Sequence, residues 1–189
     1  MLYGISDGML LLGALGVDPW DVLQQGLSRR IGLGVGTWAV IVGALVLLLW
    51  VPLRQRPGFG TVSNVIVVGL VIDAVLALFH TPHGLLLRYV LMLGGVFLNG
   101  IATGAYIGAG LGPGPRDGLM TGLAARGHSI RVVRTSIELT VLVAGWILGG
   151  SIGLGTVVYA LGIGPLAHVF IPRLAISGPV PETTALEGH

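Results

Sequence analysis

The side chains best suited to binding an ion or a polar solute stand in a segment that occurs twice, at residues 15–30 and 111–126. In each copy a proline falls at the expected first position of a helix, and an aspartate follows two residues later. Free amides and the helix dipole favour a carboxylate in this first turn. The residues that we predict to line a substrate or ion path here are Asp18, Pro19 and Asp21 in the first copy, and Pro115, Arg116 and Asp117 in the second.

The groups at these two helix starts would attract ligands of opposite charge. Helix N-termini and Arg116 attract an anion, whereas ionised Asp21 and Asp117 repel one. A cation or a proton would use the carboxylates, and an anion would use the amides only if Arg116 neutralises Asp117. Simple capping of each helix by its aspartate is the alternative interpretation. The sequence leaves these alternatives open.

Further ionisable residues lie within apolar runs, where a charge costs a few kcal/mol and is expected to face other helices and find a partner. Arg134 and Glu138 are four residues apart and can pair along one helix, so a structural ion pair is the alternative to a place in a solute or proton path. The residues that we add to the predicted path on this ground are Asp7, Asp73, Arg134, Glu138 and His168.

The composition predicts an integral membrane protein. The mean hydropathy is +0.92, and 10% of the residues are charged, against about 25% in a typical soluble domain. The chain has no lysine and no cysteine, so it offers neither a basic nucleic-acid surface nor a thiol nucleophile. No histidine or acidic cluster has metal-ligand spacing, and no catalytic triad can be assembled. We therefore expect no enzyme, no metal, no cofactor and no nucleic-acid partner.

The elements that must position these residues are six apolar runs, at residues 1–14, 38–53, 61–79, 85–109, 132–149 and 156–171. A helix needs about 20 residues to cross a bilayer. The first run is shorter than its counterpart in the second half, so we predict that the first helix is truncated at its N-terminus. The segments after Pro19 and Pro115 are only about a dozen residues long, too short to span.

The two halves read as a tandem duplication. At a constant offset of 96, residues 15–30 and 111–126 share eight of sixteen positions. Three spans per half is an odd number, which predicts inverted-topology repeats at residues 1–84 and 85–174, followed by a disordered cytoplasmic tail at 175–189. Placing both termini in the cytoplasm puts seven arginines inside and three outside, as the positive-inside rule favours. The predicted fold is an all-α polytopic membrane protein.

Two placements remain open for the short helices. Each is either a half-helix that dips into the membrane with its arginine end at the surface, or an amphipathic helix that lies flat at the interface. Glycines spaced by four, at Gly100, Gly104 and Gly108, allow close helix packing. They predict contacts within the chain or, alternatively, a homo-oligomer.

The segments LGVDPWDVLQQGL, GPGPRDGLMTGL and SIRVVRTSIELTVLVAGWILGG resemble the YczE/YyaS/YitT group of bacterial integral membrane proteins, in particular its YczE-like, actinobacterial type. The resemblance covers about residues 2–173. It implies a multi-pass protein of the bacterial plasma membrane, in contact with the lipid bilayer, and it supplies no catalytic or binding residues.

We expect the function to lie between the two proline-capped helices. The favoured hypothesis is a small secondary transporter or channel-like permeation protein for an unidentified small polar or charged solute. The alternative is a membrane accessory or scaffold protein that binds a partner protein or lipid without transporting anything. A polar cavity that reaches both proline caps would favour transport, and a solid bundle with the short helices on its surface would favour the accessory role.

Overall fold

A computed structural model describes residues 1–110 and 112–175, and all regular structure in these residues is helical. The predicted C-terminal tail, apart from Ala175, lies outside the described residues. The helices are α1 (Leu2–Gly13), α2 (Pro19–Ile31), α3 (Val35–Leu53), α4 (Phe59–Leu78), α5 (Leu85–Gly108), α6 (Pro115–Ala124), α7 (Ile130–Ile147) and α8 (Leu154–Leu174).

The helices correspond to the predicted apolar runs, and α2 and α6 correspond to the duplicated short segment. In the described part of the chain, α3, α4, α5 and α8 are long and apolar enough to cross a membrane on their own. Helix α1 has only 12 residues, and α7 carries three charged residues within its 18. Large apolar side chains cover the outside of the bundle; Phe59 is 82% exposed and Leu86 79%. Such a surface suits lipid, so the fold is that of an all-helical membrane protein.

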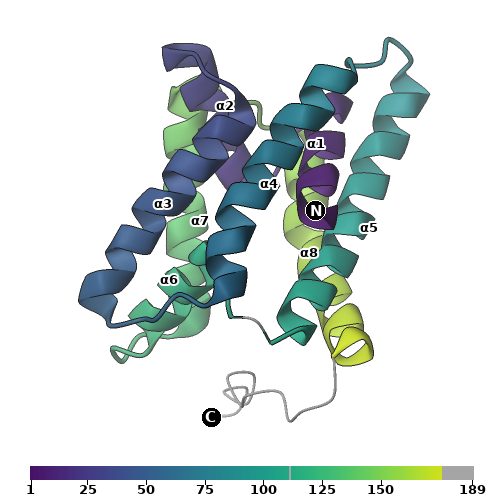
Figure 1. The fold of residues 1–189 in the computed structure, drawn as a ribbon. Coiled ribbons are helices and arrows are strands. Elements are labelled where there is room, and N and C mark those ends of the chain that lie inside the picture. Colours follow the sequence, from purple (N-terminus) through teal and green to yellow (C-terminus); the bar gives the residue numbers. More distant parts are fainter. Residues whose placement is uncertain (111, 176–189) are drawn as a thin grey trace.

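The same helix pairs pack together in the two halves. Helix α1 packs on α4 as α5 packs on α8, and α2 packs on α3 as α6 packs on α7. The halves are also interlocked, because α2 packs on α7, α6 packs on α3, and α1 packs on α5. In Figure 1, α2 lies near one end of the bundle and α6 near the other. The two short helices therefore approach the middle of the bundle from opposite ends.

Hydrogen bonds connect the two halves at the loops that precede the short helices. The start of α4 binds the loop before α6, and the start of α8 binds the loop before α2. The Thr61 hydroxyl, in the first turn of α4, donates to the carbonyl oxygen of Pro113 at 2.7 Å. In the other half the amide of Gly155, at the start of α8, donates to the carbonyl oxygen of Leu15 at 2.8 Å. These bonds satisfy loop carbonyls in the interior and set where α2 and α6 begin.

Close packing of α2 on α7 depends on two glycines. A Cβ atom on Gly26 would lie 2.5 Å from the carbonyl oxygen of Gly145, and one on Gly145 would lie 2.4 Å from the amide nitrogen of Leu23. Side chains at these positions would push the helices apart. The glycines therefore allow the short helix of one half to sit within the other half.

Candidate ion and solute site between two short helices

The loops that lead into α2 and α6 make the same turn. Gly16 has φ 107° and Gly112 has φ 109°, a left-handed region that glycine adopts without steric strain. Each loop then enters its helix through a proline, Pro19 or Pro115, which needs no amide hydrogen bond there. The duplicated sequence thus encodes the same turn and helix start in both copies.

The N-termini of the two short helices meet inside the protein. A nitrogen of the Arg116 guanidinium, Nη1, lies 3.0 Å from Asp18 Oδ2, and Nη2 lies 3.9 Å from Asp21 Oδ1. The guanidinium carbon also lies 5.1 Å from the centre of the Trp20 ring, within range of a cation–π contact. The first turn of α6 is therefore joined to the first turn of α2 by charge.

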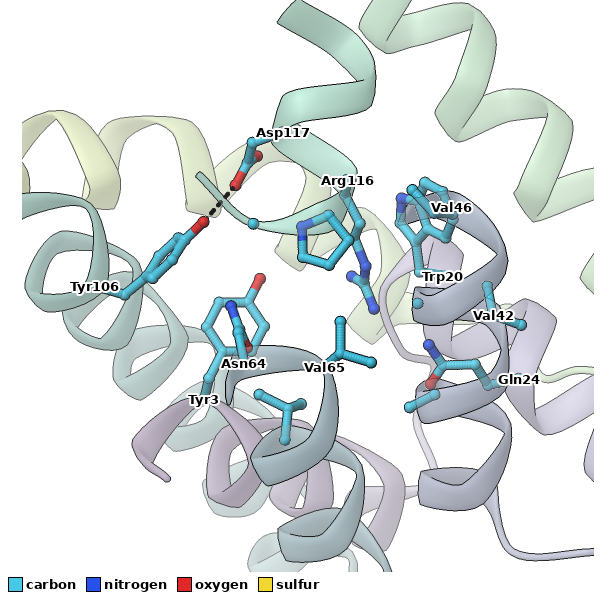
Figure 2. Close-up of a pocket in the computed structure, with 15 residues that line it drawn as sticks. Tyr3, Trp20, Gln24, Val42, Val46, Asn64, Val65, Tyr106, Arg116 and Asp117 are labelled. Atoms are coloured by element: carbon cyan, nitrogen blue, oxygen red, sulfur yellow. Dashed lines mark hydrogen bonds between the residues drawn. The ribbon is translucent and has the colours of Figure 1, made fainter. Parts of the chain in front are cut away.

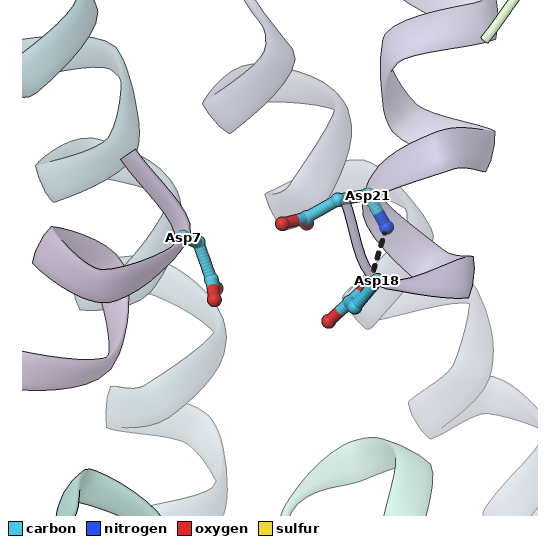
Figure 3. Close-up of side chains that lie close together, drawn as sticks. All are labelled: Asp7, Asp18 and Asp21. Atoms are coloured by element: carbon cyan, nitrogen blue, oxygen red, sulfur yellow. Dashed lines mark hydrogen bonds between the residues drawn. The ribbon is translucent and has the colours of Figure 1, made fainter. Parts of the chain in front are cut away.

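Three aspartates come together beside this contact, and we call Asp7, Asp18 and Asp21 the acidic cluster. Their exposed fractions are 0%, 1% and 0%. One carboxylate oxygen from each lies within 4.8 Å of the others. Figure 3 shows Asp7, from α1, facing Asp18 and Asp21, from the start of α2, across a shared space. Asp18 also accepts a 2.7 Å hydrogen bond from the Asp21 amide, so it caps α2 while belonging to the cluster.

Polar side chains from two other helices hold Asp7. The amide nitrogen of Asn99, on α5, donates to Asp7 Oδ1 at 2.8 Å and to the Ser6 hydroxyl at 2.9 Å. The Tyr159 hydroxyl, on α8, donates to the carbonyl oxygen of the Asn99 side chain at 3.2 Å. This chain of bonds fixes the orientation of Asp7 from the second half of the protein.

Gln24 links the cluster to Arg116 on the α2 side. In the amide orientation that satisfies both of its ends, Gln24 donates to Asp21 Oδ1 at 2.9 Å and accepts from Arg116 Nη2 at 3.3 Å. Two oxygens of the cluster, Asp7 Oδ2 and Asp21 Oδ2, are buried and have no hydrogen-bond partner among the described residues. Buried polar atoms are nearly always paired in native proteins, so these two require an explanation.

The charges of the site do not balance. The salt bridges that the described residues make to the cluster come from Arg116, so three ionised carboxylates would leave an excess of two negative charges. Burying an uncompensated charge is costly unless protons or a bound cation neutralise it. Arg116 is partly buried, with 25% of its side chain exposed. Three ionised carboxylates would therefore need protons or a cation in addition to Arg116.

A cavity of about 80 Å³ is lined by Arg116 and by Gln24, the two residues that also contact the cluster. Figure 2 shows Arg116 and Asp117 reaching it from α6, with Trp20 and Gln24 on the α2 side. The other polar side chains that line it are Tyr3, Asn64 and Tyr106. A wider groove of about 410 Å³ between α1, α4 and α5 shares these last three residues with the cavity.

The indole nitrogen of Trp50 donates to the carbonyl oxygen of Pro115 at 3.0 Å and so holds the start of α6 beside the cavity. A Cβ atom on Gly118 would lie 2.0 Å from the Trp50 ring. The glycine in the second copy, where the first copy has Val22, makes room for this tryptophan.

The predicted path residues divide into two groups. The structure brings Asp7, Asp18, Asp21 and Arg116 together and places Asp117 at the cavity, where its Oδ2 lies 3.5 Å from the Tyr106 hydroxyl. Asp73 instead receives hydrogen bonds from the Gly36 amide at 2.7 Å and the Thr37 hydroxyl at 2.8 Å, and so caps α3. Arg134 and Glu138 form the predicted i, i+4 pair at 2.9 Å on α7, and His168 is exposed on α8.

Sequence reasoning missed Asn99, Gln24 and Tyr159 as parts of the site. A signal for Asn99 existed, because it is an amide in the middle of a mainly apolar helix and aligns with another polar residue, Tyr3, at the offset of 96. Gln24 and Tyr159 carried no comparable signal, since polar residues on short helices and tyrosines near helix starts are common.

The matched family covers nearly the whole helical region. A model described as "Family of unknown function (DUF6198)" matches residues 2–172, which include both short helices and all residues of the acidic cluster. The chain belongs to this family. It is 40% identical to an uncharacterized protein of Haemophilus influenzae, over 92% of this chain and 80% of that protein.

Two proteins of Bacillus subtilis confirm the resemblance to the YczE and YyaS proteins. The uncharacterized membrane protein YczE is 37% identical over 85% of this chain and 75% of its own length. The uncharacterized protein YyaS is 32% identical over 91% of this chain and 92% of its own length. No solved structure matches the chain. The description of YczE as a membrane protein supports a membrane location, and these comparisons assign no activity.

Proposed function

We propose that the protein is a small secondary transporter or channel-like permeation protein for a small polar or charged solute, acting in the bacterial plasma membrane. The solute site is the cavity between the N-termini of α2 and α6. The observation that carries the proposal is the lining of this cavity: it includes polar residues from both short helices, and two of them, Gln24 and Arg116, also contact the buried aspartates.

The cost of the buried charges supports this function. Ionisable groups at membrane depth are expensive and mark ion and substrate pathways in membrane proteins. A protein that only scaffolds a partner could fill the same space with apolar side chains, which pack at least as stably as a buried ion pair. Three aspartates and an arginine kept in the interior are better explained by a ligand that passes there.

The placement of the short helices supports a transporter architecture. In several transporter folds, discontinuous helices from two inverted repeats meet near the bilayer midplane and present their N-termini to the solute. Here α2 and α6 meet through Arg116 and Asp18, and the same helix pairs recur in both halves. The burial of Trp20 and Asp21 favours half-helices over helices that lie flat at the interface.

Cysteine accessibility tests the proposal, and the absence of native cysteines makes the background clean. We would place single cysteines at Val42 and Asn64, which line the cavity, and treat sealed vesicles of both orientations with an impermeant thiol reagent. A transporter is expected to expose these positions to one face in each state, and a channel to both faces at once. Failure to label from either face, with or without detergent, would rule out a permeation route through this cavity.

The same background tests the inverted repeat. Arg29 and Arg126 are exposed at the ends of α2 and α6, so single cysteines there are expected to react from opposite faces of the membrane. His83, in the loop between α4 and α5, serves as a reference for one face. Labelling of both arginine positions from the same face would contradict the inverted topology while leaving the cavity test unaffected.

A further inference from the structure

The acidic cluster has the geometry of a metal-cation site. One oxygen each from Asp7, Asp18 and Asp21 lie within 4.8 Å of one another, close enough for a single cation to contact all three. Hard cations such as Ca²⁺ bind carboxylate oxygens at about 2.3–2.6 Å and accept irregular ligand sets. Sequence spacing alone did not suggest this, because Asp7 belongs to a different helix from Asp18 and Asp21.

The unpartnered oxygens are an independent sign of a ligand. Asp7 Oδ2 and Asp21 Oδ2 are fully buried, accept no hydrogen bond from the described residues, and belong to side chains that face each other in Figure 3. The other oxygen of Asp7 is held by Asn99, and the other oxygen of Asp21 faces Arg116 at 3.9 Å. Each carboxylate is thus oriented by one oxygen and leaves the second available.

Arg116 offsets part of the negative charge of the cluster when no cation is bound. Arg116 is close to Asp18 but only loosely paired with Asp21, at 3.0 and 3.9 Å, and it also lines the cavity. It neutralises one of three carboxylates. Because it belongs to α6 while the cluster belongs to α1 and α2, a movement of α6 relative to α2 would withdraw it and open the cluster to the cavity.

We propose that Asp7, Asp18 and Asp21 bind a small hard metal cation, Na⁺ or Ca²⁺, and that Arg116 is a tethered competitor that compensates the cluster when the cation is absent. The excess of negative charge argues against an anion as the ligand of this cluster. The role of the cation as coupling ion or cargo rests on the proposed transport function, but its binding does not.

The binding test uses the purified full chain in detergent at one pH. Thermal unfolding is followed as NaCl replaces N-methylglucamine chloride at constant ionic strength, and separately as CaCl₂ is added. One of the two cations is expected to raise Tm in a saturable way, because a ligand that binds only the folded state stabilises it. A Tm that responds to neither cation overturns the proposal.

The substitutions predict changes of opposite sign. Asp7→Asn and Asp21→Asn are expected to weaken cation affinity by about 100-fold, since even a lost second-shell partner typically costs 10–100-fold. Arg116→Gln is expected to strengthen it by about tenfold or more, because a nearby positive charge is removed. A merely structural salt bridge predicts no gain in affinity for this variant. Unchanged or weaker cation binding by Arg116→Gln overturns the competitor role, even if the aspartate variants do not fold.

Asp73→Asn is the matched control. It removes the same charge from an aspartate that caps α3, so it is expected to lower the baseline Tm and to keep the full cation response. Loss of the response in this variant contradicts the assignment of the site. Cation binding without alternating cysteine exposure would leave the site standing and remove the transport function. Alternating cysteine exposure with no cation response would remove the cation site and leave the transport function standing.

Discussion

The first turns of α2 and α6 share a backbone and differ in chemistry. Both follow a glycine at φ near 108°, Gly16 at 107° and Gly112 at 109°, and both have proline at the start of the helix. In α2 the cap is Asp18, which is buried and accepts from the Asp21 amide. In α6 the cap is Gly114, with no side-chain bond, and the following residue is Arg116.

This difference shows how a duplicated element can form an asymmetric site. The glycine and proline positions control where each short helix starts and which way it points. The side chains around these positions differ, because the first copy has Asp18 where the second has Gly114, and the second copy has Arg116 where the first has Trp20. The result is a charged contact across the middle of the bundle that two identical copies would not form.

The largest expected effect comes from making the second copy as acidic as the first. Arg116→Glu would remove the salt-bridge partner of Asp18 and add a fourth carboxylate to the site. Repulsion between this fourth carboxylate and the other three adds to the loss of the ion pair, so we expect a much larger fall in the free energy of unfolding than for Arg116→Gln, and little folded protein. Thermal unfolding in detergent measures this, with Arg134→Glu, on the exposed α7 pair, as the control. Equal stability of the two variants would show that the contact between the short helices is unimportant.

An intermediate effect is expected at the shared turn. Gly16→Ala and Gly112→Ala would each force a side chain into a left-handed backbone, at a cost of roughly 1–2 kcal/mol. The new methyl group would also lie 2.6 Å from the Gly153 nitrogen in one case and 2.9 Å from the Thr61 hydroxyl in the other. Chemical or thermal unfolding should therefore show similar losses for both variants. A loss of stability in only one of the two variants would mean that the turn is not equivalent in the two halves.

The smallest effect is expected at the outer ends of the short helices. The guanidinium of Arg29 donates to the Gly149 carbonyl, after α7, and that of Arg126 donates to the Pro52 carbonyl, near the end of α3. These exposed bonds cap helix C-termini and are worth about 1 kcal/mol or less. Arg29→Ala and Arg126→Ala should lower Tm slightly and equally in detergent. A large loss at either position would indicate that these ends carry more of the packing than the inner ends do.

Much of the fold was predictable from local signals. The apolar runs indicated the helices because a membrane span needs a long hydrophobic stretch, and the duplicated proline and glycine positions indicated where α2 and α6 begin. The same repeat pointed to Asp18, Asp21 and Arg116 as site residues. Within residues 1–110 and 112–175, the four helices that can cross a membrane by themselves were all among the predicted spans.

Other parts of the site were not predictable, because they depend on which helix faces meet. Asp73 and Asp7 are both single aspartates in apolar helices, yet Asp73 bonds the start of α3 while Asp7 faces the cluster. Their sequence surroundings do not distinguish them. The difference follows from helix packing: α4 lies against α3, and α1 lies against both α4 and α5.

The amino-acid sequence by itself determined the membrane class, the positions of the helices, the repeated turn and the charged residues at the two short helix starts, because each depends on neighbouring residues along the chain. Only the tertiary structure decided that Asp7 joins Asp18 and Asp21, that Asn99 orients Asp7, and that Arg116 offsets part of their charge. The physical reason is that the net charge and satisfaction of a buried site depend on groups brought together from distant segments.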